Sequence, residues 1–240
     1  MEKLIIAHRG ASGYEKENTL AAFQKAVELG ADMVEFDVRR TRDGELVVIH
    51  DSKVEGQKIC ELSYEEVKNI SKRLGFGVPK LEELLVLLKN KIKLDIELKE
   101  EGCETETVEL ALRYFDKSEF IMTSFKKNSL RIVKKKFPDI RTGLLLGGRG
   151  ETGKIFRAYL DGLFSFGAAK KIDADYILPQ WTLAILPFYL MMLQCIGLPV
   201  IVWTVDRQKT AARFLKHKNV AGIITDYPDL LYRRKENRKY

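Results

Sequence analysis

Short apolar runs rich in β-branched residues recur along the chain, separated by stretches with a helical pattern of apolar positions. We expect eight of these runs to form strands, at residues 4–8, 33–38, 93–98, 120–124, 141–146, 174–178, 200–205 and 222–225. Most intervening segments repeat apolar residues three and four positions apart, which predicts helices such as 20–29, 81–90, 106–115, 129–137 and 210–218. Strand and helix alternating eight times is the sequence form of an α/β fold, the (β/α)8 or TIM barrel.

A hairpin interrupts this alternation after the second strand. Asp43-Gly44 is a strong turn signal because both positions accept a positive φ, and residues 45–50 alternate like a returning strand. One helix follows, and we expect it to begin after Ser63 because Glu66 completes a capping box with that residue. The sequence therefore predicts a β-hairpin and a short helical insertion over the barrel mouth.

The stretch 181–205 is apolar enough to be compared with a membrane span. However, Pro187 suits the first turn of a helix, Gly197 suits its C-terminal cap, and Pro199 blocks its continuation. These residues predict a helix of ~10 residues followed by a strand. We favour a buried helix and strand over a span.

Length and composition indicate one globular domain. A chain of 240 residues with 45% hydrophobic and 31% charged residues suits a single TIM-barrel domain over residues 1–240. The net charge is +7, and the chain ends in a basic tail at 233–240. We expect no nucleic-acid partner, because neither an aromatic and basic groove nor a zinc-ligand spacing accompanies this tail.

The cysteines and the N-terminus favour a cytoplasmic location. Cys60, Cys103 and Cys195 are odd in number, widely spaced and without a metal-binding pattern, which suits a reducing compartment. The first strand begins by Leu4, and no secretory-signal pattern precedes it.

Candidate chemistry is concentrated around the second strand and the hairpin. Side chains alternate along a strand, so Glu35 and Asp37 point the same way and form a seat for a cation. The hairpin returns His50 towards them. The alternative is a surface hairpin whose acids are simply solvated.

Other charged residues favour the first interpretation because they too fall at strand ends. A barrel carries its chemistry at the carboxyl ends of its strands and in the loops that follow. The candidates obey this rule on four strands: His8 and Arg9, Glu35 and Asp37, Glu97 and Lys99, and Trp203.

Several motifs in this order resemble the glycerophosphodiester phosphodiesterase family of metal-dependent TIM-barrel enzymes. They are HRG at 8–10, ENT at 17–19, ExD at 35–37, DGxxVVxHD at 43–51 and ExK at 97–99, followed by TSF at 123–125, VWTVD at 202–206 and GIITDYPD at 222–229. The resemblance thus covers almost the whole chain.

The resemblance implies a divalent cation, Mg²⁺ or Ca²⁺, held by Glu35, Asp37 and Glu97. Hard cations of this kind prefer carboxylate ligands. It also implies that Arg9 and Lys99 hold the phosphate, Arg through its planar fork and Lys as a point charge.

The resemblance further implies that His8 and His50 act as general acid and base. Imidazole suits this task because its ordinary pKa of ~6.5 lies near working pH. The remaining histidine, His217, is expected at the surface near a helix end. Glu17 takes a supporting role near the metal, although Asn18-Thr19 next to it could simply cap the following helix.

Trp203 has two interpretations. It could present an aromatic wall to the alcohol part of a substrate, or it could be a core residue.

The activity implied is hydrolysis of a glycerophosphodiester to sn-glycerol 3-phosphate and an alcohol, with a small-molecule substrate. One alternative is a lysophospholipase D acting on lysolipids at a membrane surface, suggested by apolar segments at 155–168 and 188–197. The other is a non-catalytic phosphate- or lipid-binding barrel. Members of the resembled family often carry a longer insertion here, with a DRTT-like turn that residues 52–63 lack. This difference leaves the head-group preference open.

Overall fold

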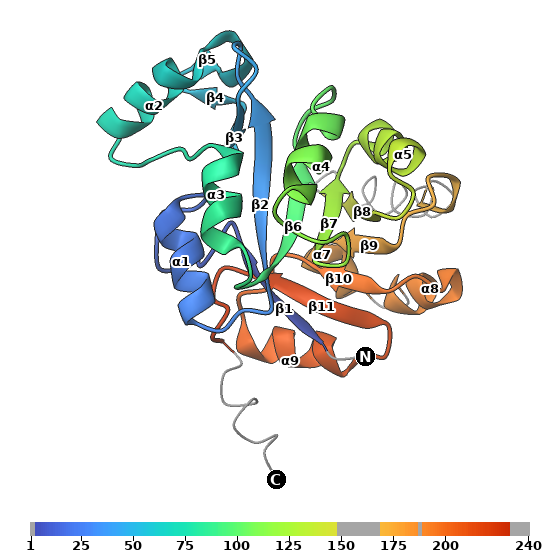
Figure 1. The fold of residues 1–240 in the computed structure, drawn as a ribbon. Coiled ribbons are helices and arrows are strands. Elements are labelled where there is room, and N and C mark those ends of the chain that lie inside the picture. Colours follow the sequence, from blue (N-terminus) through green and yellow to red (C-terminus); the bar gives the residue numbers. More distant parts are fainter. Residues whose placement is uncertain (1–2, 148–168, 187–188, 231–240) are drawn as a thin grey trace.

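The computed structural model describes residues 3–147, 169–186 and 189–230. Within them, eight parallel strands close into a barrel, because the first strand pairs with both the last and the second. In order around the barrel the strands are β1 Leu4–His8, β2 Met33–Arg40, β6 Lys93–Leu98, β7 Phe120–Ser124, β8 Arg141–Leu146, β9 Tyr176–Pro179, β10 Val200–Val202 and β11 Val220–Thr225. The TIM-barrel prediction is confirmed, with strand ends shifted by a few residues (Figure 1).

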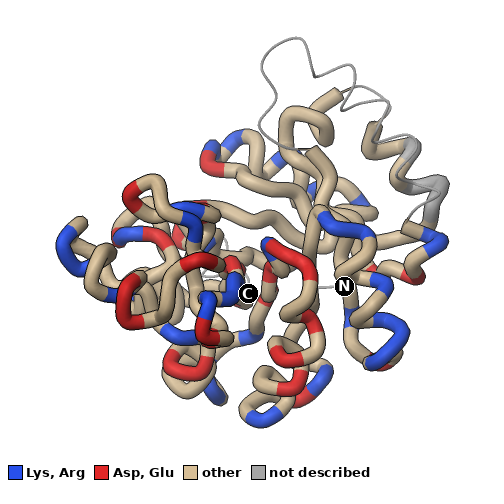
Figure 2. The backbone as a smooth tube through the Cα atoms, turned by 90° about the horizontal axis from the view of Figure 1, so that it is seen from above, with Lys and Arg blue, Asp and Glu red and all other residues tan. Residues whose placement is uncertain are grey.

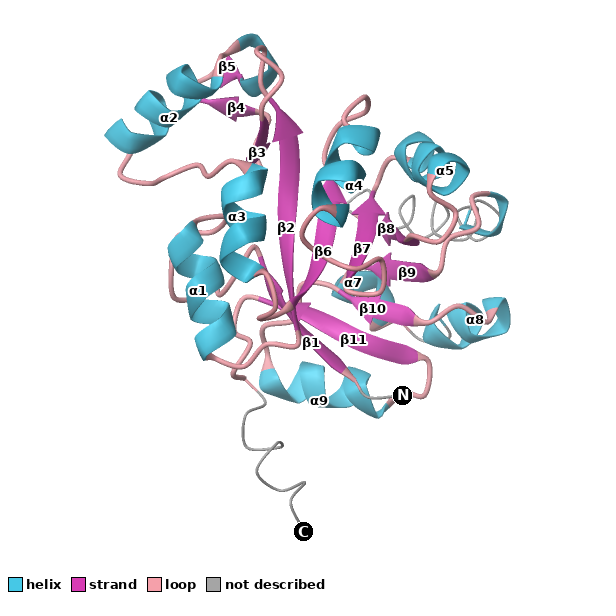
Figure 3. Ribbon diagram, viewed as in Figure 1, coloured by secondary structure: helices cyan, strands magenta, loops and turns pink. Residues whose placement is uncertain are grey.

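Helices surround the strands on the outside of the barrel (Figure 3). Those described are α1 Leu20–Glu28, α3 Leu81–Leu88, α4 Glu104–Leu112, α5 Lys127–Lys136, α7 Trp181–Ala184, α8 Tyr189–Ile196 and α9 Gln208–Lys216. Their apolar faces and the outward-pointing strand residues form the main core. In β2, for example, Val34, Phe36 and Val38 are fully buried in this layer.

The inward-pointing residues of the same strand change character along its length. Met33 lies in the apolar cluster that fills the start of the barrel, together with Ile6, Ile121, Leu178 and Ile201. Two and four residues later, the same side of β2 carries Glu35 and Asp37. The barrel interior is therefore apolar at the N-terminal end and charged at the C-terminal end.

The predicted hairpin is present, but its turn differs from the expected one. Strand β3 (Leu46–Val48) pairs antiparallel with the end of β2. The Gly44 N–H donates to Thr41 O, and the Thr41 N–H donates to Glu45 O. Gly44 has a φ of +88°, whereas Asp43 does not have a positive φ. The loop is therefore a turn closed by a single left-handed glycine, a common three-residue hairpin.

The insertion after the hairpin has a small core of its own. It contains β4 (Lys53–Val54), β5 (Gln57–Lys58), a 3-10 turn (Ile59–Glu61) and α2 (Tyr64–Arg73). Val47 of the hairpin, Ile59 and Val67 are almost completely buried in this core. The capping box between Ser63 and Glu66 is confirmed. The insertion projects beyond the end of β2 (Figure 1).

The apolar stretch 181–205 forms short elements, as expected. Helix α8 is followed by Gly197, whose φ of +79° suits the end of a helix, and then by β10. Tyr189 and Leu193 are fully buried against the barrel. Among the described residues, no helix is long and apolar enough to cross a membrane. Pro187, the segment 155–168 and the basic tail lie outside the described residues.

Substitution of Gly10 by alanine tests the packing of α1 against the end of β1. Its φ is +81°, and a Cβ there would lie 2.6 Å from the Ala22 backbone carbon, whereas a Cβ on Gly44 would meet nothing within 4 Å. We expect Gly44→Ala to lower the free energy of unfolding by about 1–2 kcal/mol, the cost of a left-handed L-residue. Gly10→Ala should cost about 3 kcal/mol or more, because it adds a backbone clash. Urea unfolding measures both, and equal losses would contradict this packing.

Candidate active site

The C-terminal mouth of the barrel contains a cavity of about 500 Å³. Eight of the nine residues selected from the sequence line it: His8, Arg9, Glu17, Glu35, His50, Glu97, Lys99 and Trp203. The ninth, Asp37, is fully buried and contacts two of these residues from below. The structure therefore brings the whole predicted set together at the expected end of the barrel.

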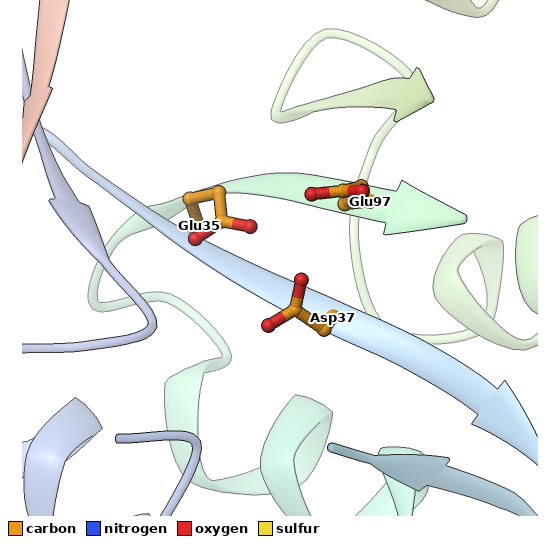
Figure 4. A group of neighbouring side chains, drawn as sticks. All are labelled: Glu35, Asp37 and Glu97. Atoms are coloured by element: carbon orange, nitrogen blue, oxygen red, sulfur yellow. The ribbon is translucent and has the colours of Figure 1, made fainter. Parts of the chain in front are cut away.

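Glu35, Asp37 and Glu97 form one carboxylate cluster. One oxygen from each lies within 4.8 Å of the others, and Figure 4 shows the three groups converging from β2 and β6. Their exposed fractions are 4%, 0% and 6%, so the alternative of a surface hairpin with solvated acids is wrong. The backbone explains the convergence, because Asp37 and Glu97 are register partners on neighbouring strands.

Burial and mutual repulsion make the ionised cluster costly. Burial, followed by the neighbouring carboxylates, raises the pKa of both Glu35 and Glu97. Burial also raises the pKa of Asp95 to about 7, although Thr123 donates a hydrogen bond to it. Elsewhere, acidic and basic residues are interspersed along the described backbone (Figure 2). The concentration of negative charge is thus a local property of the cavity floor.

Asp37 is the member of the cluster that stays ionised. Its Oδ1 lies 2.9 Å from Lys99 Nζ, and its Oδ2 lies 3.2 Å from Arg9 Nε. Burial alone would raise the pKa of Asp37, but Lys99 and Arg9 outweigh it and hold that pKa well below its usual range. Lys99 also donates to Glu97 at 2.7 Å. Three carboxylates therefore face two cationic side chains.

Arg9 is held at the end of β1 from several sides. Its φ is +54°, and its backbone N–H donates to Glu35 Oε2 at 2.9 Å. Its guanidinium donates to Glu17 Oε2 at 2.8 Å. Glu17 therefore supports the site by pairing with Arg9, and it is not one of the three clustered acids.

Asn18 is a site residue that the sequence analysis missed. Its Nδ2 donates to Asp37 Oδ2 at 2.7 Å, and the side chain is almost fully buried. The capping role belongs to Thr19 alone, whose hydroxyl accepts from the Ala22 N–H. Asn18 has a φ of +57°, a conformation that Asn tolerates better than most residues. The ENT motif was its only signal in the sequence.

His50 lies two residues after the returning strand β3 and lines the cavity. Arg39 donates to the His50 carbonyl from Nε at 3.0 Å and from Nη2 at 2.8 Å, which fixes the backbone. His50 Nδ1 lies 2.8 Å from Asp51 Oδ1. Burial lowers the pKa of His50, and Lys99 and Arg9 lower it further against the attraction of Asp37. His50 is therefore neutral at neutral pH.

The other two histidines occupy different environments. His8 ends β1 and lines the cavity, with Nδ1 2.6 Å from Asp226 Oδ1. His217 caps the end of α9 and does not line the cavity, in keeping with its expected place at a helix end.

Trp203 fits both of its interpretations. Its Nε1 donates to the Leu178 carbonyl at 2.7 Å, which anchors the ring in the barrel wall. It also lines the cavity and meets Phe125 edge to face, with ring centroids 5.5 Å apart. The second aromatic, Phe125, follows the end of β7 and was not selected from the sequence.

The fold and the cavity define a class of protein, a TIM barrel with buried acids, two cationic side chains and two histidines at its C-terminal mouth. The sequence model of the glycerophosphoryl diester phosphodiesterase family matches residues 8–230. The chain belongs to this family, as the motifs predicted, and members of the family are hydrolases.

Individual relatives match over most of their length. The glycerophosphodiester phosphodiesterase of Caldanaerobacter subterraneus is 35% identical over 250 residues, covering 96% of this chain and 97% of the relative. Human lysophospholipase D is 24% identical over 267 residues, covering 94% and 84%.

A solved structure shows the same fold. An Oleispira antarctica phosphodiesterase in complex with its product sn-glycerol-3-phosphate matches with a TM-score of 0.78 and 22% identity, covering 97% of this chain and 96% of that one.

Glu97→Gln tests whether the carboxylate cluster is strained without a cation. Burial raises the pKa of Glu97 above its unfolded value, so its contribution to stability is complete at low pH and is lost as pH rises through the raised pKa. With a chelator present, we expect the melting temperature to fall less between about pH 4.5 and 7 for the variant than for the wild type, because these limits are the ordinary and the raised pKa of Glu97. Added Mg²⁺ or Ca²⁺ should stabilise the wild type and not the Glu97→Gln variant.

The control is Glu109→Gln, which changes an exposed acid of α4. It should follow the wild type at every pH and respond to the cation. Parallel curves for Glu97→Gln and the wild type would contradict a strained cluster.

Proposed function

We propose that the protein hydrolyses glycerophosphodiesters to sn-glycerol 3-phosphate and an alcohol, using His8 and His50 as acid and base beside a divalent cation. The observation that carries this proposal is the convergence of both histidines, the carboxylate cluster, Arg9 and Lys99 on one cavity. The product bound to the Oleispira relative supports the substrate class. The family match over 8–230 supports a single domain over residues 1–240.

The carboxylate cluster fits a hard divalent cation. Its donors are all oxygens, as Mg²⁺ and Ca²⁺ prefer. Burial, followed by the neighbouring carboxylates, raises the pKa of Glu35 and of Glu97, although Arg9 lowers the first and Lys99 the second. When bound, such a cation supplies Lewis-acid polarisation of a phosphate oxygen.

Arg9 and Lys99 are placed to orient the phosphate. Both line the cavity and both are held by Asp37, so their positions are fixed before substrate enters. Fixed positive groups stabilise the charge that develops on the phosphoryl oxygens without reorganising during the reaction. Arg9 can engage two oxygens through its fork, and Lys99 one.

The two histidines supply the proton transfers. One imidazole takes the proton of the attacking hydroxyl as its oxygen bonds to phosphorus. The other gives a proton to the leaving alkoxide as the second P–O bond breaks. The neutral form of His50 can serve as the acceptor at the start of the reaction. The attacking hydroxyl is that of water, or it is the glycerol 2-hydroxyl, in which case the alcohol leaves first and water opens the resulting cyclic phosphate in a second step.

A lysophospholipase D keeps the same site and is the second candidate. The human relative carries that name, and the cavity has an aromatic wall of Phe125 and Trp203 that would accept an apolar group. Phe125 is 40% exposed, so this wall reaches solvent. A non-catalytic binding barrel is disfavoured, because it would have no need of two histidines beside the acids.

A substrate comparison tests the proposed function. We expect brisk turnover of glycerophosphocholine and slow turnover of a lysophosphatidylcholine, measured as release of choline. Chelation should abolish both activities, and Mg²⁺ or Ca²⁺ should restore them. Turnover that survives exhaustive chelation would contradict the metal, and a preference for the lysolipid would favour the second candidate.

Histidine substitutions test the proton transfers. His8→Ala and His50→Ala should each lower kcat by ~10² or more, the usual contribution of a positioned acid or base. His217→Ala is the matched control, because His217 lies outside the cavity and should leave kcat unchanged. Circular dichroism checks that all three variants fold. Equal losses in the His217 and His8 variants would overturn the assignment.

A further inference from the structure

Closure of the barrel brings His8 into contact with an acid that is distant from it in sequence. Strands β1 and β11 pair in register, with Ala7 opposite Thr225, so the next residues on each strand meet at the cavity. His8 Nδ1 lies 2.6 Å from Asp226 Oδ1, across 218 residues of sequence. Both residues line the cavity.

Asp226 is itself held by hydrogen bonds with neighbouring residues. The Ser12 hydroxyl donates to the same Oδ1 at 2.9 Å. The Asp226 backbone N–H donates to Asp206 Oδ1 at 2.9 Å, and the Gly13 N–H donates to the Asp226 carbonyl at 2.9 Å. The carboxylate is thus anchored through its side chain and on both sides of its backbone.

The acid beside the other histidine is more exposed. Asp51 follows His50 directly in the chain, and its side chain is 75% exposed against 33% for Asp226. Burial alone would raise the pKa of Asp226, but hydrogen bonds from His8 and Ser12 outweigh it and lower that pKa. Asp226 is therefore an ionised acceptor at neutral pH.

We propose that Asp226 is a positioning residue for the reaction, which accepts the Nδ1–H of His8 and so leaves Nε2 as the nitrogen that exchanges a proton with substrate. The inference rests on the proposed acid–base role of His8. An ionised acceptor fixes both the tautomer and the orientation of the ring, and it stabilises the imidazolium that forms when Nε2 is protonated.

Asp226→Asn tests this role with little change of shape. The amide has no negative charge, and its NH2 can donate to Nδ1 and impose the wrong tautomer. We expect kcat for glycerophosphocholine to fall by ~10²–10⁴, by comparison with the same change in other carboxylate–histidine pairs. KM should change by no more than about twofold, because Asp226 does not bind the substrate.

Nitrogen NMR of ¹⁵N-histidine protein provides a readout that does not depend on turnover. In the wild type, His8 should be protonated at Nδ1, and in Asp226→Asn the proton should move to Nε2. The matched control is Asp229→Asn, three residues further on, whose carboxylate accepts from Tyr14 and does not line the cavity. This control should leave both the tautomer and kcat unchanged.

Two further variants separate positioning from a structural effect. In a His8→Ala background, Asp226→Asn should cost little more, because the residues act as a unit. A full additional loss there, or an unchanged His8 tautomer in Asp226→Asn, would overturn the proposal. Ser12→Ala keeps the charge and should give a smaller loss of kcat with the wild-type tautomer, which guards against misfolding of Asp226→Asn.

These outcomes are distinguishable from failure of the proposed function. If the wild type released no alcohol from any glycerophosphodiester, the proposed function would fail. The NMR measurement would still decide whether Asp226 sets the tautomer of His8.

Discussion

The mouth of the barrel depends on a carboxylate that is completely buried, that of Asp37. A buried charge without partners costs several kcal/mol or more, so the fold must supply compensating groups. It supplies Arg9, which follows β1, Lys99, which follows β6, and Asn18 from the loop before α1. One buried charge thereby fixes the relative positions of three segments.

The same arrangement leaves the remaining acids poorly compensated. Glu35 and Glu97 lie in the same cluster, and Asp37 pairs with both cations, so that Lys99 is shared between Asp37 and Glu97. Their raised pKa values show that the folded chain resists full ionisation of the site. Such local destabilisation is what a binding site for a cation requires, because the ligand offsets a charge that the protein alone does not balance.

The two histidines are held by different parts of the fold. His50 is carried by a hairpin and insertion with a separate small core, and its carbonyl is held by Arg39. His8 belongs to the barrel wall, and its partner comes from the last strand. A change in the insertion can therefore alter the surroundings of His50, whereas His8 is tied to the closure of the barrel.

The sequence alone determined the barrel, the family and most of the site, because those properties follow from short-range patterns. The alternation of a strand is enough to put Glu35 and Asp37 on one side, and a capping box is enough to start a helix at Ser63. The geometry between segments was decided only by the tertiary structure. The burial of the acids, the bond from Asn18 to Asp37 and the pairing of His8 with Asp226 depend on how strands close into a barrel. No local period encodes such contacts, because their partners are separated in sequence and meet only when the strands assemble into the barrel.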